Sequence, residues 1–445
     1  MTVLAYLLVA FNSLLSIYLF VQKRRLSSPF QFFYLMLFSL SIFPSFLDIQ
    51  TGPFTFHPFA PPIYLSPRLV ATAHSKIAVM LMLFVLFERF LGRHSGPPIE
   101  LPKLQIGFNI YDCVIGLLIV ALMGGVWAYG LADLSKLSFD DIRYGKTSQY
   151  ALLIFYIQAM IVGVPAIYWL KGNRKLTAAG VLLLFATTYL FMGGSRQTII
   201  LSLAVFFALV LAKQGAWRYV LLIVIFTIGF STAEILLQAV KALRNLPSTG
   251  QRMALLADLL AGNADLEGTS LEGTVRYVMY GFLNDRPPPD FGQLAYFRRA
   301  LLFWLPSAIA FEGLKPPDFE MTMFAEAMGN RSGTMHATFF GSAYADAKAF
   351  SFIWVAWFVL GFRLLEGIML RLRPLERSMV WSSCIYLSFM AARGSLYAPL
   401  VITATVLLLA WLSRVLQPVF GTEALVAGDG PLHRPFTNPS RQIGQ

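Results

Sequence analysis

The stretch "VLAYLLVAFNSLLSIYLFV", residues 3–21, decides the fold class of this chain, because it contains no charged residue. A helix needs about 20 mostly apolar residues to cross a hydrocarbon layer of roughly 30 Å. No positively charged segment precedes the stretch, and it runs into Lys23-Arg24-Arg25 without a clear cleavage site. These features predict a membrane helix rather than a secretion signal.

The composition of the whole chain predicts the same class. Of its 445 residues, 57% are hydrophobic and only 13% are charged, whereas about 25% charged residues is usual for a soluble domain. We therefore expect an all-α polytopic membrane protein with about eleven transmembrane helices. The predicted spans are residues 2–22, 28–48, 69–91, 109–132, 150–170, 175–193, 197–213, 216–239, 349–371, 378–396 and 398–415.

The distribution of positive charge predicts the orientation in the membrane. The net charge is +12, but the Lys and Arg residues gather at the ends of predicted helices, which argues against a nucleic-acid partner. One set of alternate short loops contains fourteen Lys and Arg residues, and the other set contains six. Because positive loops stay in the cytoplasm, we predict an outside N-terminus and a cytoplasmic C-terminus.

This orientation divides the chain into four parts. Residues 1–239 carry eight spans and a short outer loop at 133–149, and residues 240–348 form a large outer region. Residues 349–416 carry three more spans, and residues 417–445 form a cytoplasmic tail. Long ordered insertions usually carry function. Within the large region, Arg298–Phe311 is too short to span, and we expect it to lie at the membrane surface or to dip in.

The ionisable residues within the predicted spans favour an enzyme over a transporter. His74, Lys76, Arg196, Glu234 and Arg393 all fall near the outer ends of their helices. A secondary transporter commonly places polar groups near the bilayer midplane, on broken helices of repeated halves. Polar groups gathered at one face suit an enzyme that works where the outer leaflet meets water.

Several motifs, in a fixed order, carry a resemblance to a known family. They are "DIRYGKTSQY" in the short outer loop, "GGSRQT" at the start of a span, then "RALLFWLPSAIAFEGLKPP" and "HATFFGSAYADA" in the large outer region, and "ARGSL" at the end of the predicted span 378–396. In this order they resemble the bacterial O-antigen and oligosaccharide-repeat-unit polymerases, the Wzy-type membrane glycosyltransferases. The resemblance covers roughly residues 133–396. It implies a glycosyltransferase-C-like bundle with a large periplasmic loop region in the bacterial inner membrane.

The resemblance also implies a substrate and partners. The substrate is an undecaprenyl-pyrophosphate-linked oligosaccharide, whose growing glycan is transferred to a sugar hydroxyl on the next lipid-linked repeat unit. Membrane lipid and a chain-length-determining membrane protein are the implied partners, and no cofactor is expected. Arginines followed by glycine eleven positions later, described for some polymerases, do not occur in the long region. The related O-antigen ligases therefore stay an alternative, and a transporter of lipid-linked sugar is a second one.

Glycosyl transfer needs a base for the accepting hydroxyl, and histidine has a suitable pKa range. His336 is the preferred candidate, because Arg331 lies nearby and Gly333, Ala337 and other small residues permit close approach of a substrate. A surface histidine in a loop is the competing interpretation. His74, which could instead serve only in helix packing, is the alternative base.

The departing pyrophosphate needs positive charge, which arginine supplies with paired hydrogen bonds. We expect Arg196, Arg331 and Arg393 to bind it, with Arg143 and Arg276 next. Arg196 follows two glycines and opens a helix, where an anion is favoured. For Arg393, which precedes Gly394-Ser395, a purely structural helix cap is a competing interpretation.

Two further motifs leave their interpretation open. Tyr344 could contact sugar, although an aromatic residue at the membrane interface is the commoner explanation. In "SFDDIR", Asp140 and Asp141 could hold a metal ion, but Ser138 followed by Asp141 also matches a helix capping box. The two cysteines fall inside predicted helices and show no zinc-site spacing. We predict a reaction without a metal.

Overall fold

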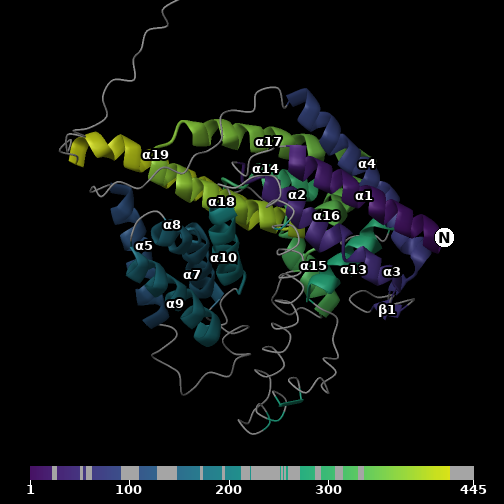
Figure 1. Cartoon of the computed structure of the whole chain (residues 1–445), viewed down its shortest axis with the longest axis horizontal. Helices are drawn as coiled ribbons and strands as arrows, with labels where there is room; N and C mark the ends of the chain where they lie inside the picture. Colours follow the sequence, from purple (N-terminus) through teal and green to yellow (C-terminus); the bar gives the residue numbers. More distant parts are fainter. Residues whose placement is uncertain are drawn as a thin grey trace, which may run out of the picture.

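The computed structural model shows a bundle of helices with one short β-hairpin (Figure 1). It describes residues 1–22, 28–50, 54–56, 63–91, 110–127, 148–170, 174–192, 196–211, 271–285, 292–305, 314–328 and 335–420, and positions 221, 251, 254, 257 and 258. The hairpin pairs two antiparallel three-residue strands, with Phe54 opposite Leu65. It is a small departure from the all-α class that the sequence predicts.

Helices occupy most of the described ranges. Those of the first half are α1 (Thr2–Gln22), α2 (Gln31–Leu37), the π-helix η1 (Phe38–Ile42), α3 (Ser45–Gln50), α4 (Pro67–Leu91), α5 (Ile110–Val126), α7 (Ser148–Met160), α8 (Val164–Leu170), α9 (Lys175–Met192) and α10 (Arg196–Leu211), with the strands β1 (Phe54–Phe56) and β2 (Ile63–Leu65) before α4. Those of the second half are α13 (Leu271–Leu283), α14 (Ala295–Leu301), α15 (Phe319–Met328), α16 (Thr338–Ala347), the 3₁₀ turn η4 (Lys348–Phe350), α17 (Phe352–Leu370), α18 (Pro374–Arg393) and α19 (Tyr397–Phe420).

Six helical segments among the described residues are long and apolar enough to cross a membrane, in agreement with the predicted membrane-protein class. They are Thr2–Val21, Gln31–Gln50, Pro67–Leu91, Leu153–Leu170, Phe352–Leu370 and Tyr397–Leu416. Shorter apolar helices cover Ile110–Val126, Lys175–Thr188 and Thr198–Leu209. The predicted span 216–239, apart from position 221, the loop at 133–147 and the tail from 421 lie outside the described residues. The number of eleven spans and the sidedness therefore stay predictions.

Two of these segments are interrupted where proline removes a backbone donor. The Phe43 N–H bonds the Phe38 carbonyl at 2.8 Å in the π-helix that ends just before Pro44. Pro165 similarly follows the break between α7 and α8, where Gly163 packs against Ser382 of α18. Because proline cannot donate to the preceding turn, the helix must rearrange or bend there.

Helix α18 lies between two groups of helices, with α5 and α7–α10 on one side and α1, α2, α4 and α13–α17 on the other (Figure 1). It is the least apolar of the long helices in the described part of the chain, and nearly all of it is buried. Its serines satisfy their hydroxyls within the protein, for example Ser382 on the Ser378 carbonyl and Ser388 on the Pro29 carbonyl. Such internal bonding lets a serine-rich helix occupy the centre of a membrane bundle.

An aromatic core anchors the helix that follows His336. Phe339 of α16 contacts the rings of Phe33, Phe84 and Phe358, with centroids 5.4, 5.5 and 4.8 Å away. These three rings belong to α2, α4 and α17. Helix α16 is thereby fixed to three helices at once, which makes it a rigid support for the residues on either side of it.

The described parts of the predicted outer region 240–348 pack against the bundle. Helix α13 contacts α4 and α16, and α14 contacts α16 and α19. Helix α16 approaches α13 so closely that a Cβ at Gly341 would lie 2.9 Å from the Met279 Cα. Helices α13, α14 and α16 of this region are therefore integrated with the helical bundle.

The contact between Gly163 and α18 gives a first prediction. A Cβ at Gly163 would overlap the Ser382 side chain, so Gly163→Ala forces α7 and α8 away from α18. We expect the free energy of unfolding to fall by about 1–3 kcal/mol, as for other overpacked cores. Gly180→Ala in α9 is the control, because nothing lies within 4 Å of its added Cβ. Equal unfolding free energies of both variants in the same detergent would contradict this packing.

Candidate functional site

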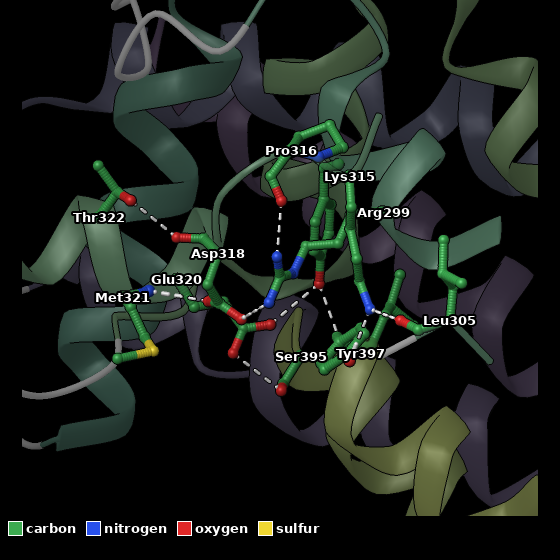
Figure 2. A network of polar contacts seen from close by, with 12 residues as sticks. Arg299, Leu305, Lys315, Pro316, Asp318, Glu320, Met321, Thr322, Ser395 and Tyr397 are labelled. Carbon is green, nitrogen blue, oxygen red and sulfur yellow. Dashed lines mark hydrogen bonds and ion pairs between the residues drawn. The ribbon is translucent and has the colours of Figure 1, made fainter. Parts of the chain in front are cut away.

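A buried carboxylate, Glu320, is the centre of a polar cluster close to the start of α19 (Figure 2). The Tyr296 hydroxyl lies 3.0 Å from Oε1, and the Ser395 hydroxyl donates to Oε2 across 2.9 Å. His336 Nδ1 lies 3.2 Å from the same Oε2. Only 6% of Glu320 and 7% of His336 is exposed. We call these four residues the Glu320 cluster: Tyr296, Glu320, His336 and Ser395.

The first turn of α15 positions Glu320. Asp318 caps this helix, because its Oδ1 accepts the Met321 N–H at 3.0 Å. The Glu320 carbonyl then accepts the Met335 N–H at 3.0 Å, which fixes the residue that precedes His336. The backbone and the side chain of Glu320 therefore both hold the His336 segment in place.

Asp346, near the end of α16, positions Tyr296. Its carboxylate accepts the backbone N–H groups of Tyr296 at 2.8 Å and Phe297 at 3.1 Å, and the Trp354 indole N–H at 3.0 Å. The two backbone groups belong to the first turn of α14, where N–H groups lack partners within the helix. Burial raises the pKa of Asp346, although the hydrogen bond from Tyr296 acts in the opposite direction.

The Tyr296 hydroxyl joins α14 to the turn between α18 and α19. It is 2.7 Å from the Gly394 carbonyl and 3.0 Å from Glu320 Oε1, and it accepts the Leu396 N–H at 3.0 Å. A hydroxyl has one proton, so the two acceptors must share it. Burial, followed by the Glu320 charge, raises the pKa of Tyr296 well above its ordinary value and keeps it a donor.

Two cationic side chains, Arg299 and Lys315, lie beside the cluster on the ring of Tyr397 (Figure 2). Each cationic group is 4.5 Å from the ring centroid. Arg299 pairs with Asp318 at 3.2 Å. Lys315 instead donates to the Leu305 carbonyl and, at 2.8 Å, to the Tyr397 hydroxyl. Among the described residues no carboxylate is paired with Lys315, whose hydrogen-bond acceptors there are both uncharged.

The carboxyl group of Asp318 is itself perturbed. Burial raises its pKa, and the neighbouring Glu320 charge raises it further, while the Met321 N–H and Arg299 act in the opposite direction. Asp318 and Glu320 place two negative charges beside Arg299, Lys315 and His336. The cluster therefore combines acid–base groups with positive charge within one small volume.

The turn that follows α18 is tightly packed against the start of α16. Gly394 adopts φ +100°, and a Cβ there would lie 2.7 Å from the Thr338 carbonyl oxygen. Thr338 is fully buried and adopts φ 56°, a conformation that β-branched residues rarely take. Such strained residues persist where the surroundings enforce them, often at functional sites.

A buried hydroxyl near the cluster has no partner among the described residues. It belongs to Tyr386 of α18, which is fully buried. Tyr386 lies within charge-interaction range of Glu320 and Arg393. A buried polar group without a hydrogen bond costs about 1–3 kcal/mol.

The structure brings together two of the predicted site residues. His336 belongs to the Glu320 cluster, and Arg393, which is 8% exposed, directly precedes the Gly394-Ser395 turn that contacts it. Three of the stretches quoted from the sequence therefore meet at one place. The first carries Arg299 and Lys315, the second carries His336 and the third carries Arg393. Residues 318–335 separate the first stretch from the second, and residues 348–391 separate the second from the third.

Two other predicted site residues bind elsewhere. Arg276 makes a bidentate ion pair with Asp48 at 2.8 and 2.9 Å, so its charge is neutralised inside the bundle. The Tyr344 hydroxyl accepts from Lys76 at 2.7 Å and donates to Asp285 at 2.7 Å. Both residues connect helices, and none of their described contacts reaches the Glu320 cluster.

His74, the alternative base, is fully buried between α1 and α4. The Asn12 amide donates to its carbonyl at 2.8 Å and to its Nδ1 at 3.0 Å. An amide N–H at Nδ1 assigns the ring proton to Nε2, an atom that has no hydrogen-bond partner among the described residues. Its described contacts are with Asn12 and Tyr280, and none of them involves the cationic side chains on Tyr397.

The remaining predicted residues are described in part or not at all. Arg196 begins α10 as expected, but the position of its side chain is not described. Arg143, Arg331 and the pair Asp140–Asp141 lie outside the described residues. Within the described ranges, no group of three or more His, Cys, Asp or Glu residues is arranged to hold a metal ion. The metal-independent reaction stays a prediction.

Sequence reasoning did not identify Tyr296, Arg299, Lys315 or Glu320 as site residues. Arg299 and Lys315 lie in a stretch that the resemblance already marks, and "PPDFE" places two carboxylates directly after Lys315. Two carboxylates beside a lysine, in an otherwise apolar region, are the sequence feature that could have identified these residues. No protein-family model, curated protein or solved structure matches this chain.

The contacts of Asp346 give a second prediction. Asp346→Ala leaves two buried N–H donors and one partly buried N–H donor without their acceptor, and each buried loss costs about 1–3 kcal/mol. We expect a lower free energy of unfolding and a red-shifted tryptophan emission, because Trp354 loses its partner. Asp285→Ala is the control, since its side chain is 66% exposed and exposed ion pairs contribute at most about 1 kcal/mol. Equal effects of the two variants would show that Asp346 does not hold α14.

Proposed function

We propose that this protein is a membrane glycosyltransferase that polymerises lipid-pyrophosphate-linked oligosaccharide repeat units. The observation that carries the proposal is the Glu320 cluster with its adjoining cations, Arg299 and Lys315. It joins a histidine, a carboxylate and positive charge beside the first residue of an apolar span, Tyr397–Leu416. A lipid-linked substrate needs this combination, because its reacting diphosphate lies next to the membrane and its lipid lies within it.

In the proposed reaction His336 is the general base. Because Nδ1 lies 3.2 Å from the Glu320 carboxylate, we assign the ring proton to Nδ1 and the lone pair to Nε2 in this reaction. Nε2 takes the proton of the accepting sugar hydroxyl. The hydroxyl oxygen forms a bond to the anomeric carbon of the donor glycan, and the bond from that carbon to the diphosphate oxygen breaks.

The leaving diphosphate keeps the electron pair of the broken bond and gains negative charge. Lys315, whose described partners are uncharged, and the neighbouring Arg299 supply positive charge there. Arg393 lies at the end of α18 next to the cluster, and Arg331 precedes His336 in the sequence. Preorganised positive charge is commonly the largest contribution to catalysis of such a step.

The side of the membrane is part of the proposal. The count of Lys and Arg in the loops predicts that the end of α18 and the start of α19 lie outside, and we propose that this side is the outer leaflet of a bacterial inner membrane. The O-antigen ligase is chemically close, because it uses the same kind of donor and a different acceptor. Single unpolymerised repeats in cells that lack the gene support the polymerase, whereas accumulated lipid-linked polymer supports the ligase.

Comparison of the two candidate histidines tests the proposed function. Purified protein is incubated with a lipid-pyrophosphate-linked repeat unit in excess chelator, and the glycans are sized. The wild type is expected to make chains of several repeats, and loss of a general base slows turnover about 10²–10⁴-fold. His336→Ala should therefore leave single repeats, whereas His74→Ala should still make chains because its ring is buried between α1 and α4.

Thermal unfolding of both variants serves as the control for folding. Chain growth by folded His336→Ala at the wild-type rate would refute the assignment of the base. Restoration of activity only after addition of magnesium or manganese would refute metal independence. If the wild-type protein makes no glycan longer than a single repeat under any condition, the proposed function itself is contradicted.

A further inference from the structure

Helix α14 and the turn that follows it, residues 295–305, carry an exposed stripe that no other part of the described chain covers. Arg298, Leu301 and Trp304 are spaced three residues apart and are all exposed, with 44% of Leu301 and 67% of Trp304 accessible. The other side of the helix is buried through Ala295, Tyr296 and Ala300. Exposed Leu and Trp side chains this close together need an explanation in a folded protein.

The depth of this stripe is fixed by two apolar spans. The ring of Phe297 contacts Trp354 and Trp357 in the first two turns of the span Phe352–Leu370, at 5.1 and 5.9 Å between centroids. Arg299 lies on the ring of Tyr397, the first residue of the span Tyr397–Leu416. Lys315 ties the end of the segment to the same residue, because it donates to both the Leu305 carbonyl and the Tyr397 hydroxyl. Residues 295–305 therefore lie at the level where both spans begin.

The chemistry of the stripe fits the boundary between lipid headgroups and acyl chains. Tryptophan is enriched at this boundary because its ring is apolar and its N–H is polar. Leucine beside it adds apolar area, and an arginine on the same face can reach the phosphates of the headgroups. Phe350 and Phe352, 57% and 42% exposed at the start of α17, extend the same aromatic level.

We propose that residues 295–305 form an interfacial anchor whose Leu301 and Trp304 insert into the bilayer leaflet on the Tyr397 side. The occupant of the stripe is lipid, and neither a second copy of the chain nor water fills it. Because Tyr296 and Arg299 of the same helix face the Glu320 cluster, the anchor is the wall between the bilayer and the cluster. The proposal requires a membrane but does not depend on glycosyl transfer.

Site-directed spin labelling of the full chain in vesicles of phosphatidylethanolamine and phosphatidylglycerol tests the anchor. The label is attached at Trp304→Cys in a Cys113→Ser background, since Cys384 is buried and Cys113 is exposed. Leu408→Cys, 53% exposed within the span Tyr397–Leu416, is the reference for the acyl-chain region. Collisions with oxygen report contact with lipid, and collisions with a water-soluble nickel chelate report contact with water.

At Trp304 we expect oxygen collisions to exceed nickel collisions, at a depth shallower than that of Leu408. Nickel collisions that dominate at Trp304 would place it in water and overturn the proposal. Low collision rates with both reagents would show that protein covers the stripe and would equally overturn it. The unlabelled protein gives a second readout, because lipids brominated near the headgroup should quench wild-type fluorescence more than that of Trp304→Phe.

Discussion

The buried charge of Glu320 is the constraint on which the rest of the site depends. A carboxylate with 6% exposure is costly unless hydrogen bonds and positive charge surround it. Its partners come from α14, from the segment that leads into α16 and from the turn after α18, so satisfying it brings together three separate parts of the chain. The same contacts position His336, so the contacts that stabilise Glu320 also give the geometry that the proposed reaction requires.

Each of these three segments is held by a second device outside the cluster. Asp346 fixes the first turn of α14, Phe339 fixes α16 to the aromatic core, and the left-handed Gly394 ends α18 against Thr338. Helix α18 is itself buried between the two groups of helices. The cluster is therefore built on rigid elements, which is the arrangement that precise catalytic positioning requires.

The helices were predictable because hydropathy is a local property of the sequence. The ranges of α1 and α4 agree with the predicted spans within two residues. The π-helix before Pro44 and the break before Pro165 depend on backbone bonding that hydropathy does not register. The site was predictable only in part. His336 and Arg393 could be identified because they lie in recognisable sequence motifs. Glu320 and Lys315 become candidate site residues only through their burial and their contact partners, which the sequence does not show. Arg276 and Tyr344 are instead occupied by partners outside the Glu320 cluster.

We propose that Lys315, which pairs with no carboxylate among the described residues, binds the lipid-linked diphosphate beside the Glu320 cluster. Titration of the purified protein with a short-chain prenyl diphosphate, followed by calorimetry, tests it most directly. We predict saturable binding at one site that weakens at least about tenfold in Lys315→Met, equal to about 1.4 kcal/mol, and stays unchanged in the exposed control Lys348→Met. Absence of saturable binding, or equal affinities of the two variants, would contradict the account.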